Sequence, residues 1–242
     1  MVDVEVRDGV ARVFLSRPEK ANALSSELLG KLRAAIESLK SDPAIRVAVL
    51  AGRGKAFCGG ADVEEMARLD ASNAAAFVER IHFVCRAIRS LDVPVVAQLH
   101  AAVIGAGLEI AAACDLRVAA EGTKFSMPEV RLGIPSVVEA ALLPRLVGSG
   151  RAAWLVLTGE AIDVRRALEW GLIEEIGGAD AVERLVAALL AGEPGALVAQ
   201  KRLLQAWEEA PLAQSITESL RAFAQAFERG NTISSRRKGN RH

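Results

Sequence analysis

The sequence predicts an α/β fold, in which buried strands alternate with helices. Two observations support this prediction. The segments at residues 47–50 and 93–97 are continuous apolar runs, which is the pattern of strands covered on both faces of a sheet. Glycine-bearing loops and stretches with apolar residues at helical spacing follow these runs. Strands that alternate with helices in this way are characteristic of α/β domains.

The first two strands are predicted to form a hairpin. Residues 2–7 and 10–15 alternate apolar and polar side chains, and Asp8-Gly9 between them is a typical hairpin turn. In the next segment apolar residues recur every three or four positions, so we expect an amphipathic helix over residues 26–40.

The middle of the chain continues the alternation. The strand at 47–50 leads into a glycine-bearing loop that extends through Asp62. In order, we then expect a helix at 72–90, a buried strand at 93–97, a short alanine-rich helix opened by Gly105-Ala106-Gly107, and a strand at 116–119.

After Pro135 the pattern is helix upon helix, interrupted only at residues 172–176. A late helix carries one apolar stripe, formed by Leu212, Ile216, Leu220, Phe223 and Phe227. Such a stripe either covers the core of its own chain or packs on another subunit. We expect one domain with a core at 1–190, a C-terminal helical region at 191–229 and a flexible basic tail at 230–242.

Composition and charge narrow the function classes. Hydrophobic residues make up 51% of the 242-residue chain, and thirty basic residues balance thirty acidic ones. Zero formal charge gives no general attraction to nucleic acid or to an anionic membrane, so any phosphate binding must be local. The three cysteines lack metal-ligand spacing and are expected to be thiols in a reducing compartment. With no signal-peptide pattern and no apolar run of membrane-spanning length, we expect a cytoplasmic protein.

The common ligand motifs are incomplete. Ile110 stands where a dinucleotide-binding motif needs its third glycine, and Val49 stands where a P-loop needs its first. Ser149 lies outside a nucleophile elbow, and neither His82 nor His100 has a carboxylate at metal-binding spacing. Nucleotide-cofactor, serine-hydrolase and zinc interpretations therefore have little support.

Two glycine-bearing segments follow buried strands, at residues 54–62 and 105–109. Free backbone amides at such positions can point at one oxygen and form an oxyanion hole. Tight turns with close packing would give the same pattern. Two glutamates, Glu109 and Glu129, stand 20 residues apart near these segments. They could act as an acid–base pair, although Glu109 could equally favour a helix N-terminus and Glu129 could be a solvated loop residue.

A resemblance decides between these alternatives. Motifs in order over about residues 1–228 resemble the crotonase superfamily, that is, the enoyl-CoA hydratases and isomerases. These motifs are RPEKANAL at 17–24, KAFCGGAD at 55–62, GAGLE at 105–109, CDLR at 114–117, FSMPE at 125–129, and LTGE at 157–160 with ALEWGL at 167–172. Each motif alone is weak, whereas the ordered set is specific.

The resemblance implies a crotonase-like spiral of ββα units and a helical C-terminal region that forms a homotrimer or a dimer of trimers. It implies an acyl-CoA thioester substrate, with no metal and no redox cofactor. The amides of Gly59 and Ala106 fall on the oxyanion-hole pair. The substrate and coenzyme A contacts fall on Lys20, Ala21, Ala23, Gly60, Ala61, Asp62 and Val63, with Lys20 either contacting a phosphate or solvated.

The same resemblance assigns roles to the glutamates. The residue matching Glu109 orients and deprotonates water, and the residue matching Glu129 exchanges the proton at Cα. Isomerases commonly keep only the second, so the presence of both favours an enoyl-CoA hydratase. The alternatives are a Δ3-Δ2 isomerase that uses Glu129 alone, a thioester hydrolase, and a catalytically silent scaffold.

One segment departs from the family pattern. Residues 132–140 replace the glycine-rich stretch of many hydratases and bring Val137 and Val138 near the expected acyl pocket. Glu139 is either a third carboxylate at the site or, as we favour, part of a capping box with Ser136. Cys58 beside the oxyanion hole is interpreted as a buried thiol rather than a nucleophile.

Overall fold

A six-stranded sheet organises the described part of the chain, which is residues 1–228 of this computed structural model. Its order is β1 (Val2–Arg7), β2 (Val10–Leu15), β3 (Val47–Gly52), β4 (Val95–Leu99), β6 (Leu116–Ala119) and β9 (Glu175–Ile176). β1 is antiparallel to β2, and every later neighbour pairs in parallel. The predicted hairpin is confirmed, with Val2 opposite Leu15.

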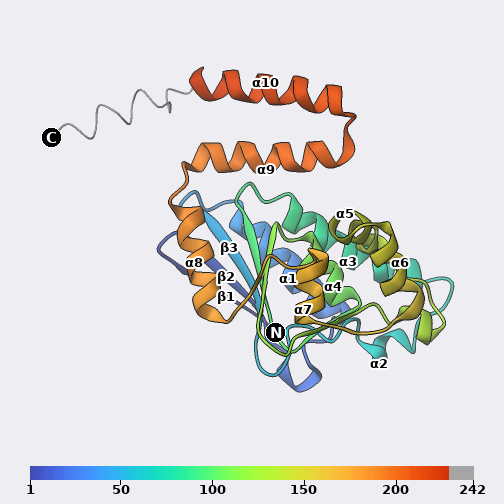
Figure 1. The fold of residues 1–242 in the computed structure, drawn as a ribbon. Helices are drawn as coiled ribbons and strands as arrows, with labels where there is room; N and C mark the ends of the chain where they lie inside the picture. Colours follow the sequence, from blue (N-terminus) through green and yellow to red (C-terminus); the bar gives the residue numbers. More distant parts are fainter. Residues whose placement is uncertain (229–242) are drawn as a thin grey trace.

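Helices cover both faces of this sheet (Figure 1). Alternate residues of β3 divide between two cores: Ala48 and Leu50 belong to the larger one, and Val47 and Val49 to the smaller one. The larger core holds α1 (Ser26–Leu39), α3 (Ala74–Arg89) and α4 (Ala106–Ala113), while α8 (Ala179–Leu190) packs on the smaller one. The continuous apolar run of β3 thus reflects burial on both faces, as predicted.

A second, three-stranded sheet lies apart from the first. It consists of β5 (Ala102–Ile104), β7 (Lys124–Ser126) and β8 (Ile162–Asp163), with β5 and β7 parallel and β7 and β8 antiparallel. The sequence analysis did not predict these strands, because two or three residues are too few to show a period. This sheet holds the start of α4 next to the segment that carries Glu129, since Gly105 N donates to Ser126 O at 2.9 Å.

Short helices complete the core region. They are η1 (Pro18–Lys20), α2 (Val63–Met66), η2 (Glu129–Leu132), η3 (Val138–Leu142), α5 (Leu143–Val147), α6 (Ser149–Thr158) and α7 (Val164–Trp170). The helix expected after Pro135 begins as a 3₁₀ turn and becomes α-helical only at Leu143.

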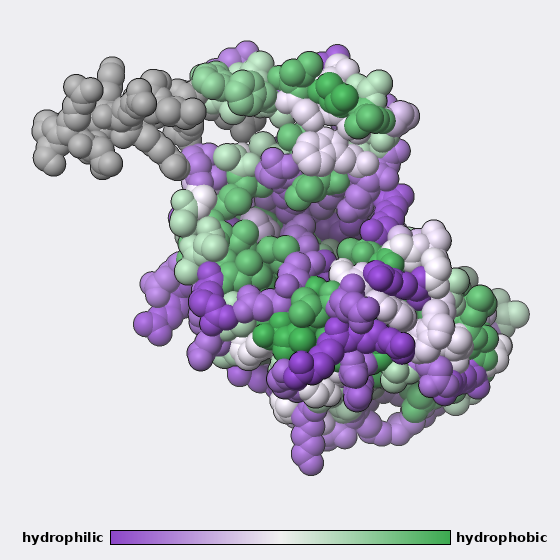
Figure 2. Space-filling model, in the orientation of Figure 1, coloured by the Kyte–Doolittle hydropathy of each residue, from purple (hydrophilic) through white to green (hydrophobic). Residues whose placement is uncertain are grey.

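The last described elements are a helical hairpin of α9 (Pro194–Glu209) and α10 (Leu212–Glu228), which stands beside the core (Figure 1). Lys201 anchors α9: its Nζ lies 2.8 Å from Asp115 Oδ2 and donates to Val93 O at 2.9 Å. The apolar stripe of α10 does not cover the core, because Leu212 is 77% exposed and Phe223 is 66% exposed. Figure 2 shows hydrophobic side chains along this helix at the top of the view. The basic tail expected from residue 230 lies outside the described residues.

No helix of residues 1–228 combines the length and the apolar character that a bilayer crossing demands. Within the same residues, no cluster of three or more histidine, cysteine or carboxylate side chains is arranged to hold a metal ion.

Candidate active site

Two glycine-bearing segments, one after β3 and one before α4, are tied together by backbone hydrogen bonds. Cys58 N donates to Ala102 O at 3.0 Å, and Ile104 N donates to Cys58 O at 3.1 Å. Gly107, in the first turn of α4, packs so closely on this strand that a Cβ there would lie 2.7 Å from Cβ of Cys58. The two segments can therefore meet because Gly107 brings no side chain into their contact.

A third segment, residues 20–24, lies along the same loop. Leu24 N donates to Gly60 O at 2.8 Å, and Asp62 N donates to Leu24 O at 3.0 Å. Ala21 and Asn22 adopt left-handed backbone angles, with φ of 51° and 56°. This turn brings the predicted contacts of residues 20–23 next to those of residues 60–63.

The assignment of the first oxyanion-hole amide to Gly59 is wrong. Gly59 N donates to Ala21 O at 2.8 Å, so its hydrogen already has an acceptor. The amide of Ala61 has no backbone acceptor within residues 1–228, because the bridge between Leu24 and Ala61 uses the amides of Leu24 and Asp62. Sequence spacing could not separate Gly59 from Ala61, since both follow the same strand.

The amide of Ala106 fits its predicted role. Ala106 is the first residue of α4, where the backbone N–H groups of the first turn have no partner within the helix. The helix dipole adds partial positive charge at this end. Ala61 and Ala106 both line one cavity of about 420 Å³, which Glu109 and Glu129 also line.

The wall of this cavity is apolar. It is formed mainly by α3, the segment before it and the loop after η2, with Met66, Leu69, Phe77, Ile81, Ile134 and Val138 as representative side chains. Val137 and Val138 line it, as the departure from the family pattern predicted. A cavity of this kind binds a hydrocarbon group and places its polar end against the few polar groups present.

Glu109 is a buried carboxyl on the first turn of α4, with 4% of its surface exposed. Burial, with the charges of Glu129 and Glu139 as smaller causes, raises the pKa of Glu109 to about 8. A hydrogen bond from the Ala140 amide lowers the pKa of Glu109 and offsets part of this rise. A carboxyl with a pKa near neutrality can both accept and donate a proton at the working pH.

Glu129 reaches the same cavity from η2. Ser136 Oγ donates to its Oε2 at 2.8 Å. Its other oxygen lies against Gly105, too close to the place of a Cβ for a side chain to fit there, and Gly105 has a φ of +51°. A side chain at position 105 would therefore be strained and would displace the Glu129 carboxylate.

The capping box favoured for Ser136 and Glu139 is wrong. The Ser136 hydroxyl bonds Glu129, and the residue that precedes η3, Val137, makes no side-chain cap. Glu139 instead lies 2.7 Å from Nδ1 of His82 through its Oε1. This partner is 57 residues away in the chain, so local spacing gave no indication of it.

The expected coenzyme A contacts are brought together, but some of their side chains are already paired. Lys20 pairs with Glu64. Asp62 pairs with Arg17 and accepts the amides of Glu64 and Glu65 at the start of α2, so its carboxylate supports the loop.

Val63 is 66% exposed and remains free to contact a ligand. Ala21 and Gly60 contribute their carbonyls to the contact between the two segments, whereas the Ala23 amide bonds Lys20 O within the turn.

Asn22 is a supporting residue that the sequence analysis missed. Its Nδ2 lies within hydrogen-bond distance of the carbonyls of Arg53, Ala56 and Phe57, and its Oδ1 accepts the Arg17 amide at 2.8 Å. The side chain thus fixes the loop that leads to Ala61. Its place in the RPEKANAL motif was the available signal.

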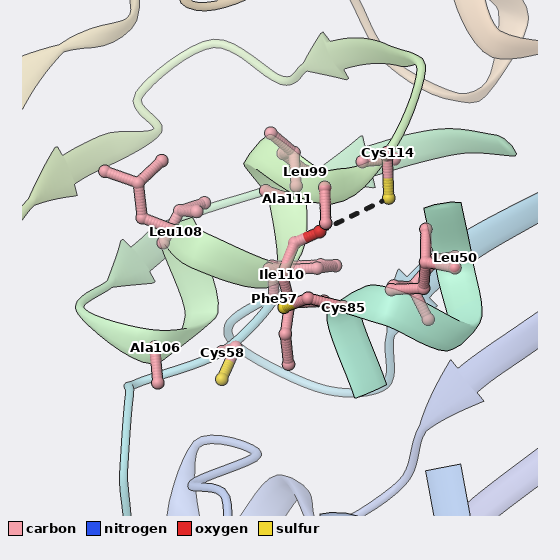
Figure 3. Close-up of a cluster of buried hydrophobic side chains, with 14 of the residues drawn as sticks. Leu50, Phe57, Cys58, Cys85, Leu99, Ala106, Leu108, Ile110, Ala111 and Cys114 are labelled. Carbon is pink, nitrogen blue, oxygen red and sulfur yellow. Dashed lines mark hydrogen bonds between the residues drawn. The ribbon is translucent and has the colours of Figure 1, made fainter. Parts of the chain in front are cut away.

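The cysteines take no part in this site. Cys58 is fully buried, and burial raises the pKa of its thiol to about 12. Figure 3 shows Cys58, Cys85 and Cys114 among Phe57, Leu108 and Ile110, with the Cys114 thiol directed at Ile110 O. The interpretation of Cys58 as a buried thiol agrees with this environment.

Comparison with known proteins gives the family. Residues 5–239 match the model of the enoyl-CoA hydratase/isomerase family. A crotonyl-CoA hydratase of Syntrophomonas wolfei is 35% identical over 175 residues, which cover 72% of this chain and 67% of that protein. An enoyl-CoA isomerase/hydratase of Mycosarcoma maydis is 30% identical over 222 residues, which cover 86% of this chain and 81% of that protein.

The crystal structure of an enoyl-CoA hydratase from Thermoplasma volcanium superposes with a TM-score of 0.90 at 30% identity, covering 94% of this chain and 92% of that one. The α/β fold with C-terminal helices predicted from the motifs is therefore confirmed. The chain belongs to the enoyl-CoA hydratase/isomerase family.

Proposed function

We propose that this protein is an enoyl-CoA hydratase, which adds water reversibly to a trans-2-enoyl-CoA thioester. The observation that carries the proposal is the meeting of four groups at one apolar cavity: the carboxyls of Glu109 and Glu129 and the backbone amides of Ala61 and Ala106. Two donors and two carboxyls are what hydration needs, because charge develops on the thioester oxygen while one proton leaves the water that attacks C3 and another is added at C2.

In the proposed step, the thioester oxygen accepts hydrogen bonds from the Ala61 and Ala106 amides. Glu109 takes a proton from water as the water oxygen bonds to C3. The electrons of the double bond move onto the thioester oxygen and return as Glu129 gives a proton to C2. The products are a 3-hydroxyacyl-CoA, a protonated Glu109 and an ionised Glu129. Before the next turnover Glu109 must lose its proton and Glu129 must gain one.

A second candidate is isomerisation of a 3-enoyl-CoA by Glu129 alone. One observation favours it: with its pKa raised to about 8, Glu109 of the free protein is mostly protonated at neutral pH and is then no base. Glu129 would move a proton from C2 to C4, and the amides would hold the intermediate enolate.

The subunit arrangement is also a proposal. The exposed stripe of α10, which comprises Leu212, Ile216, Leu220, Phe223 and Phe227, is between 52% and 77% exposed in the single chain. A contiguous apolar helix face of this kind is typical of a subunit contact. We propose that it packs on neighbouring copies in a homotrimer or a dimer of trimers.

The test is incubation of the purified protein with 2-enoyl-CoA and 3-enoyl-CoA thioesters in ¹⁸O-labelled water, with product masses recorded. Hydration adds one labelled oxygen, isomerisation adds none, and thioester hydrolysis releases free coenzyme A. Glu109→Gln separates the first two, since it should abolish hydration and spare isomerisation. Product without label from every substrate would overturn the hydratase assignment.

A further inference from the structure

The cavity of the candidate site has a buried part and a part that reaches the surface. In the buried part, α3 contributes Phe77 and Ile81, neither of which is more than 4% exposed. The first turn of the same helix contributes Ala74 and Ala75, of which Ala75 is exposed. Alanine adds only a methyl group, so these two positions leave the outer part of the cavity open.

A second stretch of the wall is also apolar where it reaches the surface. The loop after η2 contributes Ile134, Pro135 and Val137, and both Ile134 and Val137 are 39% exposed. Exposed apolar side chains are ordinary when they stand singly, whereas these gather along the edge of a cavity. Together with Ala74 and Ala75 they form an apolar outer mouth of the cavity.

Hydrogen bonds hold this second stretch in place. Ser136 Oγ, in the middle of the loop, donates to Glu129 Oε2 at 2.8 Å. Oε1 of Glu139, in the first turn of η3, lies 2.7 Å from Nδ1 of His82 on α3. The loop is thus joined to η2 at one point and to α3 at another. The outer mouth is therefore a defined feature of the folded chain.

The size of the cavity sets the number of carbons that it can hold. Its volume is about 420 Å³, and a group the size of a water molecule, to which a methylene is similar, takes about 30 Å³. There is room for about fourteen such groups. The thioester group, C2, C3 and the attacking water occupy some of this space, which leaves room for about six to eight further carbons.

The charges along the cavity are all negative. Within residues 1–228, its charged lining side chains are Asp70, Glu109 and Glu129, and no lysine, arginine or histidine lines it. The Ser72 hydroxyl and amide donate to Asp70 and lower the pKa of that carboxyl, so it is ionised at neutral pH. A carboxylate on a bound acyl chain would lose its hydration and find like charge in place of a cation.

We propose that the cavity binds the uncharged hydrocarbon chain of a medium-chain acyl-CoA, about eight to twelve carbons long, and that Ala74 at the outer mouth determines the length that fits. This assignment rests on the proposed function. With the thioester oxygen at the Ala61 and Ala106 amides and coenzyme A along residues 60–63, the acyl chain takes the remaining space between α3 and residues 134–138. Each methylene that enters this apolar space should tighten binding about fourfold.

The first test measures binding without turnover. Saturated acyl-CoA thioesters with four, six, eight, ten and twelve carbons are titrated into the protein by calorimetry. We expect Kd to fall about fourfold for each methylene between four and eight carbons and to level off by about twelve. A six-carbon chain that ends in a carboxylate, which would lie inside the cavity, should bind at least about tenfold more weakly than the six-carbon hydrocarbon chain.

The outcomes separate this inference from the proposed function. A Kd that does not change with chain length, or equal affinity for the carboxylated and uncharged six-carbon chains, overturns the inference, even if the protein hydrates a four-carbon enoyl-CoA. Affinity that rises with chain length in a protein that hydrates no enoyl-CoA leaves the inference standing and removes the hydratase assignment.

The second test narrows the outer mouth. Ala74→Phe should weaken binding of the ten-carbon thioester about tenfold or more and leave the four-carbon thioester within about twofold. Ala76→Phe is the matched control, because Ala76 is exposed on the same helix turn and does not line this cavity. It should change neither affinity. An equal loss for both chain lengths in Ala74→Phe, or the same loss in both variants, contradicts the role of Ala74.

Discussion

Replacing Glu109 by glutamine should make the folded protein more stable while removing hydration activity. Glu109 has an ordinary pKa of 4.5 and a folded-state pKa of about 8, so folding disfavours its ionised form. The folded state thus holds a proton that the unfolded chain releases between these values. The free energy of unfolding is therefore highest, as far as Glu109 is concerned, below pH 4.5. It falls as the pH rises from 4.5, and the loss is complete once the pH has passed 8.

The magnitude follows from the two pKa values. Each unit of difference corresponds to about 1.4 kcal/mol, so the full effect above pH 8 is about 5 kcal/mol. Glutamine has the same shape and no charge to desolvate, and its carbonyl can still accept the Ala140 amide. We therefore expect the stability advantage of Glu109→Gln over wild type to widen by about 3 kcal/mol between about pH 5.5 and about pH 8.5.

Urea unfolding at these two pH values, at one fixed protein concentration, measures this difference. Glu79→Gln provides the control, because the side chain it replaces is exposed on α3. A stability gap between Glu109→Gln and wild type that does not change with pH would refute the reasoning that burial raises the pKa of Glu109.

Three further outcomes test the site and the assembly. Glu129→Gln should abolish exchange of the C2 proton of a saturated acyl-CoA with deuterated water, because no other carboxyl is proposed to serve C2. It should also lower kcat by about 10² to 10⁴-fold. Exchange is measured by NMR, and retained exchange would assign that proton to another group. Ala106→Pro removes one proposed amide donor at a helix position that tolerates proline, and kcat should fall about 10² to 10³-fold with an unchanged circular dichroism spectrum. Leu220→Asp combined with Phe223→Asp should yield monomers in light scattering without loss of helix, since both side chains are more than 60% exposed in the single chain; an oligomer of undiminished size would place the subunit contact elsewhere.

Much of the fold was determined by local patterns in the sequence. The hairpin of β1 and β2 and the strand β6 begin and end at the predicted residues, because alternation and turn residues act over short distances. The helix predicted at 26–40 is α1, whose N-cap Ser25 accepts the Leu28 amide at 3.2 Å. The ordered motifs also identified the family and brought Ala106, Glu109 and Glu129 to one site before any geometry was known.

The tertiary structure decided the features that depend on partners distant in the chain. Gly59 and Ala61 stand two residues apart in the same motif, and only the hydrogen bond from Gly59 N to Ala21 O shows which amide is free. Ser136 and Glu139 have the spacing of a capping box, yet their side chains bond Glu129 and His82 instead. Sequence spacing specifies which contacts are possible along one element, whereas burial and the packing of α3, α4 and η3 select which of them form.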